Sequence, residues 1–145
     1  MTAAAIKGEP EVCEMYPEPE EVDEAIPDPA AEYLAQALES IHAPAGAIML
    51  AASSVDAMLK AKDYVEGSLY RRIDEAADDH LITEGMADWA HEVRLDANAQ
   101  RHADQDAPLP TEAEAQRVID FVQALGEFLF SLPARVDRGL EDAQS

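Results

Sequence analysis

Basic residues are scarce in this chain of 145 amino acids, because 10 lysines and arginines stand against 31 aspartates and glutamates and give a formal net charge of −21. Proteins that bind nucleic acid usually present a basic surface to the phosphates, whereas this chain repels nucleic acid at long range. A contact with RNA or DNA would therefore need a local basic cluster or a partner. A basic protein surface would instead be attracted, and the charge would speed the encounter.

Cysteines and long apolar runs are scarce as well. The single cysteine, Cys13, excludes an intramolecular disulfide framework. The longest weakly polar run, Ala43–Ala52, contains a proline and is much shorter than the roughly 18 to 20 apolar residues of a membrane span. The N-terminus also lacks the apolar core of a secretory signal. These absences predict a cytoplasmic protein that does not cross a membrane.

The acidic residues that are present are unevenly distributed. Residues 1–32 hold ten of them against one lysine, together with five of the nine prolines. Proline interrupts helices and favours extended backbone, so we expect residues 1–27 to form an extended acidic arm. The carboxylates in the second half of this arm are candidate contacts for a basic protein partner: Glu18, Glu20, Glu21, Asp23 and Glu24.

The rest of the chain has the apolar spacing of helices, and no convincing strand pattern appears. We predict an all-α, antiparallel bundle of about five helices over residues 28–138, followed by a tail at 139–145. The second helix, over about 47–62, has the most apolar face and should lie at the centre. The first helix should start at Asp28-Pro29 and the third at 67–68. Thr83 should cap a fourth helix that continues to about His102. A Thr111–Glu114 capping box should start a fifth helix, which ends before Pro133.

Three polar side chains recur at intervals of four residues in the fourth helix: Arg94, Asn98 and His102. An unbroken helix would place them on one face. Arginine stabilises phosphate charge, asparagine orients a neighbour and histidine exchanges a proton near neutral pH, so the set could support cleavage of RNA by its own 2′-hydroxyl. The alternative is structural, with Arg94 paired to an acid and the other two capping a bend. Residues 71–117 contain twelve acids against five bases, which favours a solvated mixed surface over an RNA groove.

The segment from Trp89 to His102 resembles the HEPN-like helical family known as a domain of unknown function, DUF4145. The resemblance covers about residues 16–138. Its other parts, in order, are Tyr16–Pro19, Val55–Leu59, Leu69–Asp74, Leu81-Ile82 and Leu129–Arg135.

The resemblance implies a helical bundle that often forms a homodimer and is common in prokaryotic defence and toxin systems. It also implies a ribonuclease site across that dimer, with leading roles for Arg94 and His102 and with Asn98 beside them. The interval between Arg94 and His102 is longer than usual in catalytic HEPN motifs, and Ser53-Ser54 stand where a basic residue is common. The family often carries a zinc ribbon, of which only Cys13 remains, so we expect no metal or other cofactor.

Two functions of different class therefore stay open. The first is an acidic protein-binding module of a defence, toxin–antitoxin or mobile-element system, which the excess of acid favours. The second is a metal-independent ribonuclease with a composite arginine and histidine site, which the polar row favours. Fold similarity does not decide between them, because function depends on the site.

Overall fold

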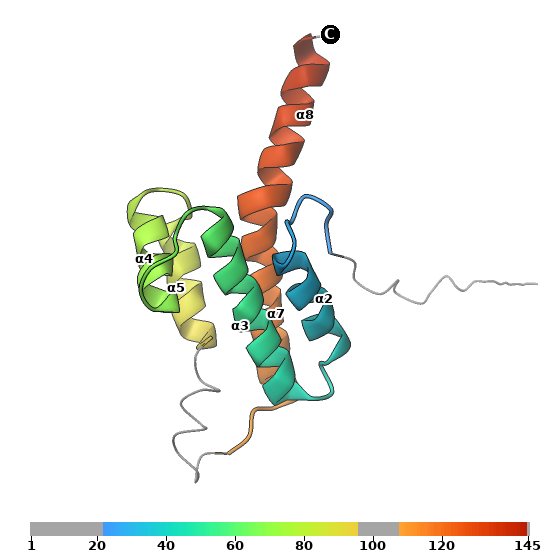
Figure 1. The fold of residues 1–145 in the computed structure, drawn as a ribbon, viewed down its shortest axis with the longest axis vertical. Helices are drawn as coiled ribbons and strands as arrows, with labels where there is room; N and C mark the ends of the chain where they lie inside the picture. Colours follow the sequence, from blue (N-terminus) through green and yellow to red (C-terminus); the bar gives the residue numbers. More distant parts are fainter. Residues whose placement is uncertain (1–21, 96–107, 145) are drawn as a thin grey trace, which may run out of the picture.

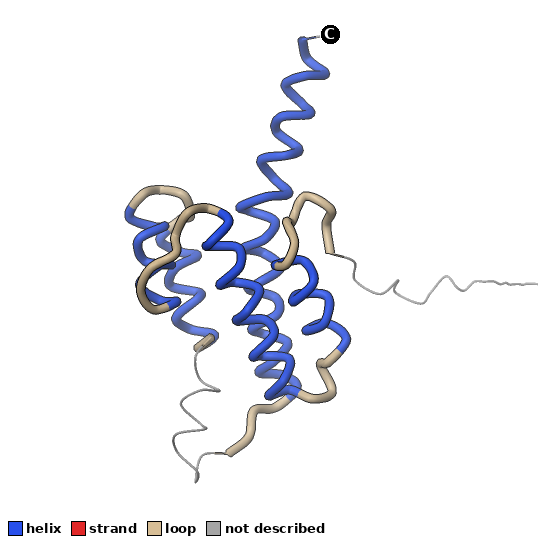
Figure 2. Tube along the Cα trace, in the orientation of Figure 1, coloured by secondary structure: helices blue, strands red, loops and turns tan. Residues whose placement is uncertain are grey.

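The computed structural model describes residues 22–95 and 108–144, and all regular structure within these ranges is helical (Figures 1 and 2). The predicted all-α bundle is therefore confirmed. The elements are α2 (Ala30–Glu39), α3 (Pro44–Ala61), α4 (Leu69–Asp78), α5 (Glu84–Val93) and α7 (Glu112–Gly126), and α7 continues through a π-helical turn, η1 (Glu127–Ser131), into α8 (Leu132–Gln144).

Helix α3 lies at the centre of the bundle, as its apolar face predicts. It packs against α2, α7 and α4, while α4 and α5 form a pair at one side (Figure 1). Val55, Met58 and Leu59 of α3 are fully buried and share the core with Leu34 of α2 and Phe121 of α7. Burial of these side chains supplies the main stabilisation of the fold.

Three predicted helix starts are confirmed by their side-chain caps. Ser68 accepts a hydrogen bond from the backbone N–H of Arg71 at the start of α4, and Thr83 accepts one from Met86 at the start of α5. At the start of α7, Thr111 and Glu114 form a complete capping box. Each cap satisfies backbone donors that the first helical turn leaves free.

Two other boundaries differ from the sequence prediction. Helix α2 begins at Ala30 with Pro29 at the N-cap position, so Asp28 is not its cap. Helix α3 begins at Pro44, three residues before the predicted start. Pro44 does not break the helix because a proline in the first turn needs no backbone N–H and already has a suitable φ angle.

The prediction that the last long helix ends before Pro133 is wrong. In the π-helical turn, the N–H of Leu132 donates to the carbonyl of Glu127, five residues back. A π turn makes room in the helix, which relieves the clash that a proline ring otherwise causes with the carbonyl four residues earlier. The chain therefore continues as α8, which includes most of the predicted tail and projects beyond the bundle (Figure 1).

The last residues of the predicted arm lie against the bundle. Asp23 to Ile26 form a turn in which the N–H of Ile26 donates to the carbonyl of Asp23, and the Ile26 side chain is buried in the core. Residues 1–21 lie outside the described residues. In the described ranges, no helix combines the length and apolar character that crossing a membrane requires.

Candidate functional site

The predicted partner-binding carboxylates fall into two groups. Glu18, Glu20 and Glu21 lie outside the described residues. Asp23 and Glu24 are exposed in the segment before α2, where an oxygen of Asp23 accepts a hydrogen bond from the N–H of Ala25 at 2.8 Å. Both carboxylates of this second group are available to a partner at the surface.

The predicted polar row does not lie on one unbroken helix. Helix α5 ends at Val93, and Arg94 takes a left-handed backbone conformation with φ 57° and ψ 63°. This turn directs Leu95 into the core, where it is buried, a common arrangement at a helix C-terminus. The shared-face argument is therefore wrong at its first member, and Asn98 and His102 lie outside the described residues.

Arg94 lies beside a second arginine and two acids. A hollow of about 140 Å³ is lined by Arg94 and Glu92 from the end of α5 and by Glu114 and Arg117 from α7. Two cations and two carboxylates balance one another at this position. The described part of the hollow therefore lacks the excess of positive charge that marks a phosphate site.

Arg72, one of the five basic residues within 71–117, is buried. Its guanidinium donates to a carboxylate oxygen of Asp56 at 2.7 Å and to the backbone carbonyl of Tyr64 at 3.3 Å. Burial opposes ionisation of Asp56, but hydrogen bonds from Lys60 and Arg72 outweigh it and lower the pKa of this carboxyl. Arg72 joins α4 to α3 and is not a surface cation.

A groove with a volume of about 780 Å³ lies between α2, α7 and the segment before α2. We call it the α2–α7 groove. Its floor is apolar and its rim carries four carboxylates, and none of the described residues that line it is a lysine, arginine or histidine. The floor consists of Val22, Ala31, Ala35, Leu38, Ile41 and Ile119, and the acids are Glu24, Asp28, Glu32 and Glu39.

Helix geometry explains why the groove has this form. Ala31, Ala35 and Leu38 are spaced so that they lie on one face of α2. The small side chains of the two alanines leave a depression in this face. Glu32 and Glu39, seven residues apart, lie along one edge of this face. The result is an apolar strip beside carboxylates, which an amphipathic helix with a basic flank would complement.

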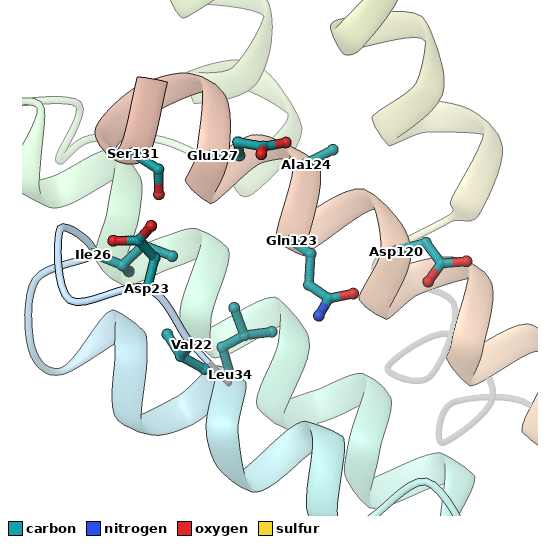
Figure 3. A pocket seen from close by; sticks show the side chains of 9 residues that line it. All are labelled: Val22, Asp23, Ile26, Leu34, Asp120, Gln123, Ala124, Glu127 and Ser131. Carbon is teal, nitrogen blue, oxygen red and sulfur yellow. The ribbon is translucent and has the colours of Figure 1, made fainter. Parts of the chain in front are cut away.

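A second hollow adjoins this groove and shares Val22 with it (Figure 3). It has a volume of about 410 Å³ and includes the carboxylates of Asp23, Asp120 and Glu127. In Figure 3, Gln123 extends from α7 toward α2. Acidic side chains thus continue along both sides of the segment that precedes α2.

Within residues 22–95 and 108–144, no group of three or more histidine, cysteine, aspartate or glutamate side chains is arranged to hold a metal ion.

The sequence predicts acidic contacts for a partner in the arm, and it did not point to the carboxylates of α2 that line the groove. The available signal was the spacing of Asp28, Glu32 and Glu39 beside the small residues Ala31 and Ala35. Helical periodicity alone does not show that this strip faces a groove instead of another helix, because that depends on how α7 packs.

The chain matches the family described as "Domain of unknown function (DUF4145)" over residues 34–143. The chain belongs to the DUF4145 family. No curated protein and no solved structure matches it significantly. The matched range of DUF4145 starts in α2 and ends in α8, so it includes the helix that projects from the bundle.

Proposed function

We propose that this DUF4145 protein is a protein-binding module whose α2–α7 groove receives a basic amphipathic helix of a partner. The observation that carries this proposal is the apolar strip bordered by four carboxylates, with no cation among the described residues that line it. Partner helices bind such grooves by placing apolar side chains at helical spacing on the floor. Lysines or arginines beside those anchors would meet the carboxylates on the rim.

The overall charge of the chain supports the same kind of partner. A net charge of −21 on 145 residues attracts a basic segment from a distance and repels an acidic one. Glu18, Glu20 and Glu21 directly precede the segment at the groove in sequence, so they add to this attraction. The apolar floor then supplies the short-range contacts that hold the bound helix.

The setting proposed for this module is a prokaryotic defence, toxin–antitoxin or mobile-element system, and it follows from the HEPN-like resemblance of the sequence. A basic toxin or nucleic-acid-binding protein in such a system has the charge that the groove accepts. Co-purification with the products of neighbouring genes tests this setting. Recovery of acidic partners only, or of partners that do not require the groove, would contradict it.

The direct test uses a synthetic amphipathic helix of about 14 residues, roughly 21 Å long, with leucines on one face and lysines beside them. The groove variant combines Glu24→Gln, Asp28→Asn, Glu32→Gln and Glu39→Gln. If each exposed charge pair contributes about 0.4 kcal/mol, the four changes raise the Kd about 15-fold at low salt. The Kd is measured by fluorescence anisotropy at several salt concentrations.

A matched control changes the net charge by the same amount elsewhere. Glu66→Gln, Glu75→Gln, Asp78→Asn and Asp88→Asn neutralise four exposed acids in and around α4 and α5. This control should raise the Kd less than about 3-fold, because it alters long-range attraction only. Equal effects of the two variants would show that binding is nonspecific and would refute the groove.

The second candidate function is a metal-independent endoribonuclease across a homodimer, with roles for Arg94, Asn98 and His102. Its support is the chemistry of these three residue types in the sequence, because the hollow that holds Arg94 and Arg117 also holds Glu92 and Glu114 and has no excess of positive charge. Purified protein would then cleave RNA in the presence of a metal chelator. His102→Ala should abolish this cleavage with the helical content unchanged, and cleavage that survives the substitution would exclude the proposed site.

A further inference from the structure

Ser131 carries a buried hydroxyl that no residue of the described ranges satisfies. It is the last residue of the π-helical turn η1 and is 8% exposed. A serine in a helix commonly donates to the carbonyl four residues back, as Ser53 does to Met49 at 3.0 Å. Ser131 makes no such bond within residues 22–95 and 108–144. Because folded proteins satisfy nearly all buried polar groups, this hydroxyl indicates a group that binds from outside.

The hydroxyl is directed into the acidic hollow of about 410 Å³ that adjoins the α2–α7 groove. In Figure 3 the hydroxyl of Ser131 and the carboxylate of Asp23 point toward one another, from η1 and from the segment before α2. One oxygen of Asp23 accepts the N–H of Ala25 at 2.8 Å. Its second oxygen remains available, so a ligand that donates two hydrogen bonds would join Asp23 to Ser131.

The charge of the hollow selects a cation. Asp23, Asp120 and Glu127 line it, and the described lining contains no basic residue. Arg135 lies 3.9 Å from Glu127 and offsets the charge of that carboxylate. Asp120 accepts a hydrogen bond only from the neutral amide of Gln116, at 2.8 Å. An excess of negative charge therefore remains at Asp23 and Asp120.

The spacing of the carboxylates selects the kind of cation. Asp120 and Glu127 are seven residues apart along α7 and η1, which corresponds to roughly 10 Å. This separation is too large for one metal ion to bind both, whereas a chain with several ammonium groups reaches both. Ile26 and Leu34, which are buried, supply apolar surface in the same hollow. Methylene groups between the charges would pack on these side chains.

We propose that this hollow binds a linear aliphatic polyamine, with a terminal ammonium between Ser131 and Asp23. An ammonium has three donors, of which one meets the Ser131 hydroxyl and another the Asp23 carboxylate. A second ammonium group lies toward Asp120, and the methylenes cover Ile26 and Leu34. The volume of the hollow is within the range of about 300 to 1,000 Å³ that is common for small-ligand sites.

The first experiment measures the Kd of the full chain for spermidine by isothermal titration calorimetry at low salt. Ser131→Ala should raise this Kd at least about 10-fold, because it removes a hydrogen bond to a charged group. The matched control Ser53→Ala should change it less than about 2-fold, since the Ser53 hydroxyl is satisfied within α3.

Thermal unfolding separates ligand binding from a structural role of Ser131. Without spermidine, Ser131→Ala should leave the thermal midpoint unchanged or raise it, because the substitution removes an unsatisfied buried hydroxyl. With spermidine, the original chain should gain more thermal stability than Ser131→Ala. A loss of stability in Ser131→Ala that is the same with and without spermidine would show a structural role only and would overturn the proposal.

Charge substitutions test the two ends of the site. Asp23→Asn keeps an acceptor for the N–H of Ala25 and should raise the Kd for spermidine about 5-fold. Asp120→Asn should raise it about 3-fold. Asp88→Asn, a matched change at an exposed position of α5, should have an effect below about 2-fold.

Three binding results would also overturn the proposal: no saturable binding of spermidine, a Kd that Ser131→Ala leaves unchanged, or effects of Asp23→Asn and Asp88→Asn that are equal. The last result would mean that spermidine acts only as a counterion for the acidic surface. None of the four carboxylates changed in the groove variant lines this hollow, so that variant should keep spermidine binding within about 3-fold. The two proposals can therefore fail separately.

Discussion

Replacement of Ile26 by alanine should destabilise the whole domain although Ile26 lies in a loop. Ile26 is 6% exposed, and its side chain fills the space over Gly126 of α7. A Cβ atom placed on Gly126 would lie 2.7 Å from Cδ1 of Ile26 and 3.1 Å from Cε of Met58. The absence of a side chain at position 126 is thus what allows the segment before α2 to dock.

The size of the effect follows from the atoms that are removed. Ile26→Ala deletes three buried carbon groups, which corresponds to about 2.4 kcal/mol at roughly 0.8 kcal/mol each. The cavity that remains adds to this cost. Ile26 also lines the hollow of about 410 Å³, so the segment before α2 has room to relax into the cavity. The loss of unfolding free energy should therefore stay near the lower end of the range of about 2 to 5 kcal/mol. For a domain of this size the midpoint of thermal unfolding should fall by about 10 °C.

A second substitution makes the prediction specific. Gly126→Ala gains about 1 kcal/mol of helix propensity, but overpacking against Ile26 costs about 1 to 3 kcal/mol. Alone it should therefore be destabilising or neutral. In the Ile26→Ala background the main clash is gone, and the same substitution should stabilise the domain by about 1 kcal/mol.

The assay is urea unfolding of the four proteins, followed by far-ultraviolet circular dichroism and analysed as a double-mutant cycle. A cost below about 0.5 kcal/mol for Ile26→Ala would show that the segment is not docked. Equal effects of Gly126→Ala in both backgrounds would show that the two positions do not touch. Either result would refute the packing that holds the segment before α2 against α7, and Val22, Glu24 and Asp28 of this segment line the α2–α7 groove.

Further substitutions test other parts of the fold. Ser54→Ala removes the buried hydroxyl that donates to the carbonyl of Ala30 at 2.8 Å, and should cost about 1 to 2 kcal/mol in urea unfolding. Thr111→Ala removes the capping box and should cost about 1 kcal/mol, which a lower thermal midpoint would report. The pKa of Asp56 is lowered in the folded state from 3.8, so its contribution is present above that pH and is lost as the pH falls through the folded value. The stability difference between the original chain and Asp56→Asn should therefore stay constant at higher pH and shrink as the pH falls from 3.8 through the lower pKa of the folded state, and a difference that does not shrink there would contradict the ion pair with Arg72.

Local signals in the sequence predicted much of the fold. The caps at Ser68, Thr83 and Thr111 are correct because each depends on a side chain only three residues from its partner. The central position of α3 is also correct, since its apolar face is wide enough to require burial on several sides. Such features need no knowledge of the tertiary arrangement.

The errors arise where tertiary packing determines the backbone. Arginine rarely adopts the left-handed conformation that ends α5 at Arg94, and burial of Leu95 stabilises it there. Pro133 normally ends a helix, but the π turn before it preserves one. The α2–α7 groove is formed by residues from separate parts of the chain, so the sequence pattern alone does not show which apolar residues come together in its floor.

Binding of a basic amphipathic helix in the α2–α7 groove, as proposed, can be followed residue by residue. Its most direct test is a nuclear magnetic resonance titration of the isotope-labelled chain with the leucine and lysine peptide described above. The largest chemical-shift changes should occur at Ala31, Ala35, Leu38 and Ile119, which line the groove floor. Changes centred on α4 and α5, or spread evenly over all acidic surfaces, would contradict it.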